Sequence, residues 1–234
     1  SSSSTRVYTA SKDKASSTAA ATTGSRSKSN ISLNPLVASV KVSKTVEVFG
    51  LVKQLESQGV EVTSLCVGEP DFLPPQVVLD ALQQAVIDGQ TRYTAVTGTL
   101  ALRQAIAEDL KRRKGTVYNP NTEIVVGNGA KQSVYQGVLA ICGAGDAMII
   151  PAPYWPSYPE MAALAGTEAI IVETQAETGY LMTPSQLRQA LEANPHVKML
   201  LLCNPSNPTG GVYSRQDLEG LANVLRAVSY THLR

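Results

Sequence analysis

The sequence VKMLLLC at residues 197–203 runs directly into NPSNPTG at residues 204–210, and this junction indicates an α/β protein. An almost unbroken apolar run of this length is typical of a strand in a parallel sheet that is covered on both faces. Ligands of open α/β sheets bind just past the carboxyl ends of such strands. An asparagine there offers both a carbonyl acceptor and an NH2 donor. Taken alone, residues 204–210 also suit a tight turn.

The composition is that of a globular protein with nearly balanced charge. The chain has 234 residues, of which 43% are apolar, and a formal net charge of +1. Such a length allows a substantial core, and the scattered Lys and Arg residues give no reason to expect a nucleic-acid partner. No apolar run approaches the roughly 18 residues of a membrane span, so no membrane partner is expected.

The cysteines and histidines do not form a metal-binding pattern. Cys66, Cys142 and Cys203 are isolated, and His196 and His232 have no companion at metal-ligand spacing. We therefore predict no metal site, and interpret the cysteines as small buried side chains in a reducing compartment.

Residues 1–30 differ in kind from the rest of the chain. Fifteen of them are Ser or Thr, five are Lys or Arg, and Asp13 is the one acidic residue. Such a segment buries too little apolar surface to offset its ordering entropy, so we predict disorder. A Ser-rich, basic, acid-poor composition is typical of an organelle transit peptide, with an ordinary disordered tail as the alternative.

Beyond the leader, predicted helices and strands alternate. Strands are expected at 60–67, 124–126, 147–150, 169–173 and 197–203; helices are expected at 46–58, 74–88, 99–115, 132–142, 157–165, 183–193 and 214–227. The capping box Thr183–Gln186 marks one helix start. This alternation predicts a mostly parallel sheet with helices on both faces. Neither G-x-G-x-x-G nor G-x-x-x-x-G-K-[ST] is present, so the sequence contains neither the common dinucleotide-binding fingerprint nor a P-loop.

Two further loops at strand ends can hold a phosphorylated ring. Gly127–Lys131 lies between a predicted strand and a helix, where small residues and free N–H groups favour an anion. Pro151–Tyr158 contains Trp155, the one Trp of the chain, which can stack on a flat ring. A plain turn with a surface lysine and a core-packed Trp are the alternatives.

The order of these loops suits pyridoxal phosphate (PLP), a flat, phosphorylated, polar ring. Gly68 in the loop Val67–Phe72 can bring the backbone close to a small ligand, and Tyr93 can donate to a phosphate. A strand-ending turn and a surface tyrosine are the alternatives at these two positions.

With these motifs in order, the chain resembles the class I (fold type I) PLP-dependent aminotransferases. The resemblance spans about residues 31–227 and rests on residues 67–72 (VGEPDF), 129–132 (GAKQ), 152–155 (APYW) and 204–210 (NPSNPTG). It implies the PLP-transferase fold of type I, incomplete here. Within the family the chain looks most like the prokaryotic-type plastid enzymes, so the resemblance implies a plastid (chloroplast) location, with mitochondrion or cytoplasm as alternatives.

The resemblance also implies roles for individual residues. Toward PLP, Ala130 and Lys131 would hold the phosphate, Trp155 would stack on the ring, Asn207 would hydrogen-bond the ring hydroxyl, and Tyr93 would reach the phosphate of the partner subunit in a homodimer. Toward the substrate, the implied residues are Gly68, which would contact the carboxylate through its backbone, together with Trp155, Asn207, Thr45 and Lys131. Thr45 and Lys131 align with positions linked to prephenate recognition.

The implied reaction transfers amino groups between aspartate or glutamate and 2-oxo acids, with prephenate giving arogenate. Another fold type I PLP enzyme, such as a carbon–sulfur lyase or a cyclopropane-forming synthase, is an alternative. A non-catalytic module that senses PLP or an amino acid is a second one. Such modules usually carry a DNA-binding domain, and the leader shows no helix-turn-helix pattern.

The resemblance implies a division of the chain as well. Residues 31–65 would form the N-terminal arm and part of a small domain, 66–227 part of the large PLP-binding domain, and 228–234 a non-native tail. The family's lysine that forms a Schiff base with PLP would lie beyond Arg234, and no lysine of this chain matches it. We therefore expect an active parent enzyme and an inactive 234-residue polypeptide.

Overall fold

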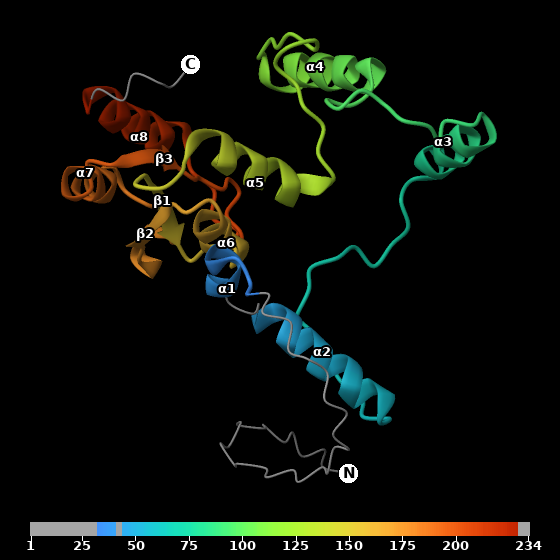
Figure 1. Cartoon of the computed structure of the whole chain (residues 1–234), viewed down its shortest axis with the longest axis horizontal. Helices are drawn as coiled ribbons and strands as arrows, with labels where there is room; N and C mark the ends of the chain where they lie inside the picture. The colour runs from blue at the N-terminus through green and yellow to red at the C-terminus, as the bar shows by residue number, and fades with distance from the viewer. Residues whose placement is uncertain (1–31, 41–43, 229–234) are drawn as a thin grey trace. The chain divides into compact units, whose positions relative to one another are not determined.

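The computed structural model describes residues 32–40 and 44–228 (Figure 1). The predicted leader at 1–30 and the predicted tail, apart from Val228, lie outside these residues. The elements in chain order are α1 (Pro35–Ser39), α2 (Lys44–Ser57), α3 (Gln76–Ile87), α4 (Leu100–Lys114), α5 (Gly129–Ile141), β1 (Ala147–Ala152), α6 (Ser157–Leu164), β2 (Glu168–Glu173), the 3-10 helix η1 (Ala176–Thr178), α7 (Pro184–Ala193), β3 (Val197–Leu200) and α8 (Arg215–Ala227). In the part of the chain that is described, no helix is both long and apolar enough to cross a membrane.

The three strands form a parallel sheet in the order β2-β1-β3. β1 is the central strand, and Ala147 pairs with Glu168 of β2 on one side and with Val197 of β3 on the other. Ala147, Met148, Ile149 and Ile150 have no exposed surface. The predicted parallel α/β sheet is therefore confirmed for these strands.

Helices cover both faces of this sheet, as predicted (Figure 1). On one face, Ala147 and Ile149 of β1 pack with a cluster from α7 and α8 that includes Leu187, Leu191, Leu221 and Val224. On the other face, Met148 and Ile150 pack with a cluster from α5 and α6 that includes Val138, Tyr158, Met161 and Ala162. The chain crosses from β1 to β2 through α6 and returns past β1 to β3 through α7. Since such crossovers are right-handed, opposite directions place the two helices on opposite faces.

Local capping signals set the helix boundaries near this core. The predicted capping box is confirmed, because the Thr183 side chain accepts from the Gln186 N–H at the start of α7. Thr99 caps α4, and Gly115 ends it in the left-handed conformation with φ 69°. α7 and α8 pack closely, since a Cβ built on Gly220 would lie 2.8 Å from Cγ of Pro184.

Some predicted boundaries are wrong. Residues 60–67 and 124–126 are not strands, and β3 ends at Leu200 rather than Cys203. A strand requires a neighbour that supplies N–H and C=O groups, and the described strands pair only with one another. α5 begins at Gly129, three residues earlier than predicted, and α1 and η1 were not predicted. The division at residues 65 and 66 stays a prediction.

Charged residues connect the amino ends of the three strands. Lys198 Nζ of β3 lies 2.9 Å from Oδ1 of Asp146, just before β1. His196 Nε2 lies 3.0 Å from Oε2 of Glu168 in β2, so this contact passes over the central strand. The hydrogen bond from Lys198 lowers the pKa of Asp146 below its ordinary value of 3.8.

Because the folded-state pKa of Asp146 is lowered, its contribution to stability is present above the unfolded pKa and is lost as the pH falls. Replacing Lys198 with methionine is therefore expected to flatten the decline in stability between about pH 5 and pH 3. Urea unfolding across this range measures the effect. Lys114→Met, at an exposed lysine in the last turn of α4, is the matched control. Equal slopes for wild type and Lys198→Met would contradict the assignment.

Candidate functional site

The candidate site lies at the carboxyl ends of β1 and β3. These strands are neighbours, yet the loop after β1 leads to α6 on one face and the loop after β3 leads to α8 on the other. Adjacent loops that leave a parallel sheet in opposite directions open a crevice, which is where such sheets bind ligands. The two predicted motifs that contain Trp155 and Asn207 are these two loops.

The two asparagines in the loop after β3 have different roles. Asn204 Oδ1 accepts from the Tyr213 N–H at 3.1 Å and so holds the loop to the start of α8. Backbone bonds close the loop, from Ser206 N to Gly211 O at 2.8 Å and from Gly210 N to Ser206 O at 2.9 Å. Asn207 stands at the tip of this closed loop and is exposed. Its amide is therefore available to a ligand, whereas that of Asn204 is structural.

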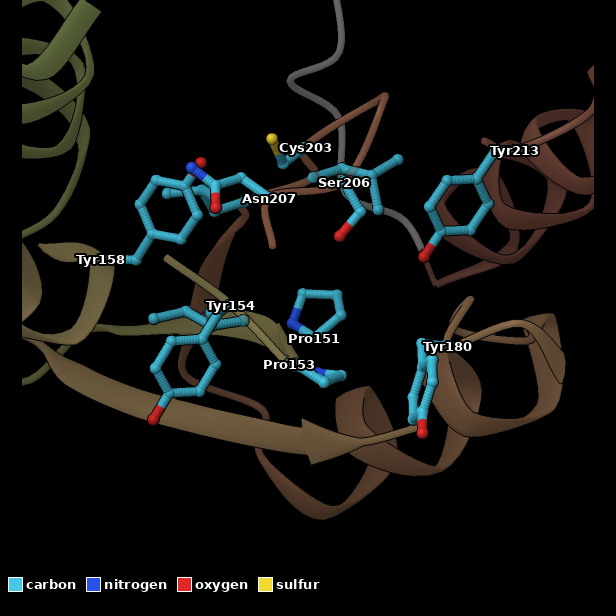
Figure 2. A pocket seen from close by; sticks show the side chains of 12 residues that line it. Pro151, Pro153, Tyr154, Tyr158, Tyr180, Cys203, Ser206, Asn207 and Tyr213 are labelled. Carbon is cyan, nitrogen blue, oxygen red and sulfur yellow. The ribbon is translucent and has the colours of Figure 1, made fainter. Parts of the chain in front are cut away.

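A small cavity of about 20 Å³ lies beneath this loop. Figure 2 shows Tyr154, Tyr158, Cys203 and Asn207 toward one end of it, and Tyr180 and Tyr213 toward the other. The remaining lining residues are Ile150, Pro151, Pro153, Leu201, Leu202 and Ser206. This volume suits about one water molecule. A ring-shaped ligand would therefore use the exposed surfaces of Asn207 and Trp155 rather than the cavity.

Trp155 is held from two sides. Lys131 Nζ of α5 lies 4.9 Å from the centre of the indole ring, in cation–π contact. Tyr158 packs edge-on, with ring centres 5.4 Å apart and an interplanar angle of 89°. Trp155 borders the core cluster of α5 and α6 but remains half-buried. The structure thus brings together Lys131 and Trp155, two of the predicted site residues.

The start of α5 fits an anion. Gly129 has φ 79°, and a Cβ on Gly127 would lie 2.5 Å from Oγ of Ser133, so both positions favour glycine. Ala130 and Lys131 lie in the exposed first turn of α5, where backbone N–H groups lack intrahelical partners. The helix dipole and the Lys131 charge both favour a phosphate here.

Two buried tyrosines keep their protons at the site. Burial, together with the neighbouring Cys203 thiol, raises the pKa of Tyr158 to about 12. Burial also raises the pKa of Tyr213, whose hydroxyl accepts from the Met182 N–H at 2.8 Å. Tyr158 therefore remains a neutral hydrogen-bonding group at physiological pH.

A wider open groove of about 590 Å³ adjoins the site between α5 and α6. It is lined by Asn128, Lys131, Gln132, Tyr135, Ser157, Glu160, Met161 and Leu164. Lys131 is shared, because its side chain lines this groove and also lies over Trp155.

Three predicted site residues lie elsewhere. Gly68 lies in an exposed loop, Tyr93 is fully exposed, and Thr45 is exposed on α2. Their roles, and those of Ala130, Lys131, Trp155 and Asn207 toward a ligand, stay predictions. Sequence reasoning missed Tyr158 and Cys203, although Tyr158 stands in the quoted loop three residues after Trp155.

The donor set at this site fits PLP. The first turn of α5 offers N–H groups for a phosphate, Trp155 offers a flat apolar face, and Asn207 offers an amide donor. Within residues 32–40 and 44–228, no three or more His, Cys, Asp or Glu side chains are grouped to hold a metal ion. The three cysteines are free thiols; the interpretation as buried side chains is confirmed for Cys142 and wrong for Cys66 and Cys203, which are half-buried.

The chain is similar to known aminotransferases. A bifunctional aspartate aminotransferase and glutamate/aspartate-prephenate aminotransferase of Petunia hybrida is 46% identical over 196 residues, which are 84% of this chain and 40% of the relative. An aspartate/prephenate aminotransferase of Cereibacter sphaeroides is 42% identical over 193 residues, 82% of this chain and 48% of the relative. The solved aspartate aminotransferase of Thermus thermophilus with maleate superposes with a TM-score of 0.80 at 38% identity, covering 85% of this chain and 51% of that one.

The chain thus spans about half the length of the relatives it matches. Residues 60–230, which are more than half of the chain, match the family described as aminotransferase class I and II. The parallel sheet, with helices on both faces and a crevice at the ends of β1 and β3, is consistent with that match. The chain therefore belongs to the class I and II aminotransferases.

Proposed function

We propose that the gene product carrying this chain is a PLP-dependent aminotransferase that transfers amino groups between aspartate or glutamate and 2-oxo acids, with prephenate among its acceptors. The observation that supports this most is that Lys131 lies over Trp155, while Trp155 packs against Tyr158, which lines one cavity with Asn207. The names of the Petunia and Cereibacter relatives support the substrates.

Each residue of the predicted site has a role in this proposal. Ala130 and Lys131 bind the phosphate, Trp155 covers one face of the ring, and Asn207 donates its amide to the ring oxygen. Gly68 and Thr45 contact the substrate together with Lys131, Trp155 and Asn207, and Tyr93 reaches the PLP phosphate of the partner subunit. When bound, PLP supplies an electron sink for the bonds at the substrate α-carbon. The protein contributes position, charge and exclusion of water.

Binding of the cofactor can be measured directly because Trp155 is the one Trp of the chain. We expect PLP to quench Trp155 fluorescence saturably, and pyridoxal, which lacks the phosphate, to bind at least about tenfold more weakly. Inorganic phosphate should compete with PLP. A folded chain that shows no saturable quenching would contradict the cofactor assignment.

Turnover is tested with the natural gene product, since this chain spans about half of its relatives' length. Aspartate and 2-oxoglutarate should give oxaloacetate and glutamate, and prephenate with glutamate as amino donor should give arogenate and 2-oxoglutarate. Release of ammonia or formation of a cyclopropane would indicate another PLP enzyme instead. We propose that the 234-residue polypeptide alone is inactive, and product formation by it would refute this.

We further propose a plastid location and a homodimer for the natural protein. The composition of residues 1–30 and the likeness to a Petunia enzyme support the first. Import of a fluorescent protein fused to residues 1–45 into isolated chloroplasts tests the location. The molar mass of the purified gene product tests the assembly.

A further inference from the structure

Tyr158 lies between the two loops of the candidate site and belongs to neither predicted binding set. It sits in the first turn of α6 and is 8% exposed. Its ring packs against Trp155 at 5.4 Å in an edge-to-face arrangement. It also belongs to the core cluster that contains Met148 and Ile150 of β1. Tyr158 is therefore anchored in the core while it contacts the stacking residue.

The other end of Tyr158 faces the loop after β3. Tyr158 and Cys203 line the same cavity, the Cys203 thiol contributes to the raised pKa of Tyr158, and Cys203 Sγ donates to Pro205 O at 3.2 Å. Tyr158, Cys203 and Asn207 line the same water-sized cavity. Figure 2 shows the Asn207 amide and the Tyr158 side chain pointing toward each other at one end of it. One rigid aromatic side chain thus reaches from the Trp155 loop to the Asn207 loop.

We propose that Tyr158 is a positioning residue that fixes Trp155 and Asn207 relative to each other. This inference rests on the proposed function, because these two side chains are the ones assigned to the face and the oxygen of the PLP ring. Beyond the pairing of Ile149 with Leu200, the two loops leave the sheet toward opposite faces. A tyrosine has only two rotatable side-chain bonds, and burial in the core leaves it little freedom. No contact with substrate or reacting atoms is assigned to Tyr158.

A pair of Tyr→Phe variants separates positioning from stability. Tyr158→Phe removes the hydroxyl that faces Cys203 and keeps the ring. Tyr213→Phe makes the same change at a second buried tyrosine of the cavity, where it removes the bond to the Met182 N–H. We expect Tyr158→Phe to weaken PLP binding about five- to tenfold and Tyr213→Phe less than about twofold, while both lower the urea midpoint. Equal losses of PLP affinity would overturn the proposal.

A second measurement needs no cofactor. Tyr158→Ala should raise the acrylamide quenching of Trp155 about twofold in the PLP-free chain, because the edge contact is lost, whereas Tyr213→Phe should leave it unchanged. Unchanged quenching in a folded Tyr158→Ala chain would refute the positioning of Trp155. If wild type fails to bind PLP, the proposed function fails, and this measurement still decides the role of Tyr158 toward Trp155.

The link to Asn207 is tested by a double-mutant cycle on PLP affinity. If Tyr158 acts through Asn207, Tyr158→Phe should weaken binding less than about twofold once Asn207 is alanine. Full additivity of the two losses would show that Tyr158 does not position Asn207.

Discussion

Asn207→Asp is expected to weaken PLP binding about a hundredfold, which corresponds to about 2.7 kcal/mol. The change removes the amide donor at the tip of the Asn204–Gly211 loop and places a carboxylate toward the ring oxygen. A hydrogen bond to a charged group contributes about 1.5–3 kcal/mol, and the added repulsion acts in the same direction. The loop itself should persist, because its closing bonds come from the backbone of Ser206, Gly210 and Gly211. Quenching of Trp155 fluorescence by PLP measures the affinity.

Asn204→Asp is the matched control in the same loop. It adds the same charge three residues away but keeps the Oδ1 acceptor for the Tyr213 N–H. PLP affinity should therefore change less than about threefold, since an exposed charge is well screened. If the two variants weaken PLP binding equally, the loss reflects charge in the loop, and the assignment of Asn207 to the ring oxygen is wrong.

Leu187→Ala should lower the free energy of unfolding by about 2–5 kcal/mol. Leu187 of α7 has no exposed surface and packs with Ile149 of β1, Leu221 of α8 and Tyr213. Truncation removes apolar contacts and leaves a cavity that the rigid sheet cannot fill. Since Tyr213 also holds Asn204, the cavity lies beneath the support of the candidate site. Urea unfolding followed by circular dichroism measures the loss.

Leu218→Ala makes the same chemical change on α8, where the side chain is 37% exposed. Its cost should remain below about 1 kcal/mol, because water already reaches the side chain. A similar cost at both positions would mean that the α7–α8 cluster is not closely packed, which would contradict the described core.

Besides the parallel sheet with helices on both faces, the features that the sequence predicted correctly are local ones. The capping box at Thr183–Gln186 and the terminator Gly115 are confirmed because each depends on neighbours within a few residues. The strand 147–150 and the helix after Ser214 followed from apolar periodicity. The failed strands at 60–67 and 124–126 have strand-like composition, but a strand also needs a partner, which composition does not report.

For the candidate site, too, some features followed from the sequence and others only from the tertiary structure. Residues 204–210, 127–131 and 151–158 pointed to the loops of the candidate site, and together with residues 67–72 they carried the resemblance to the aminotransferase family. Only the tertiary structure decided that Asn204 holds the loop to the start of α8, that Lys131 lies over Trp155, and that Tyr158 lines one cavity with Asn207, about fifty residues away in the chain. These facts depend on how the crossovers bring β3 beside β1, and contacts between distant segments are set by packing rather than by any local pattern.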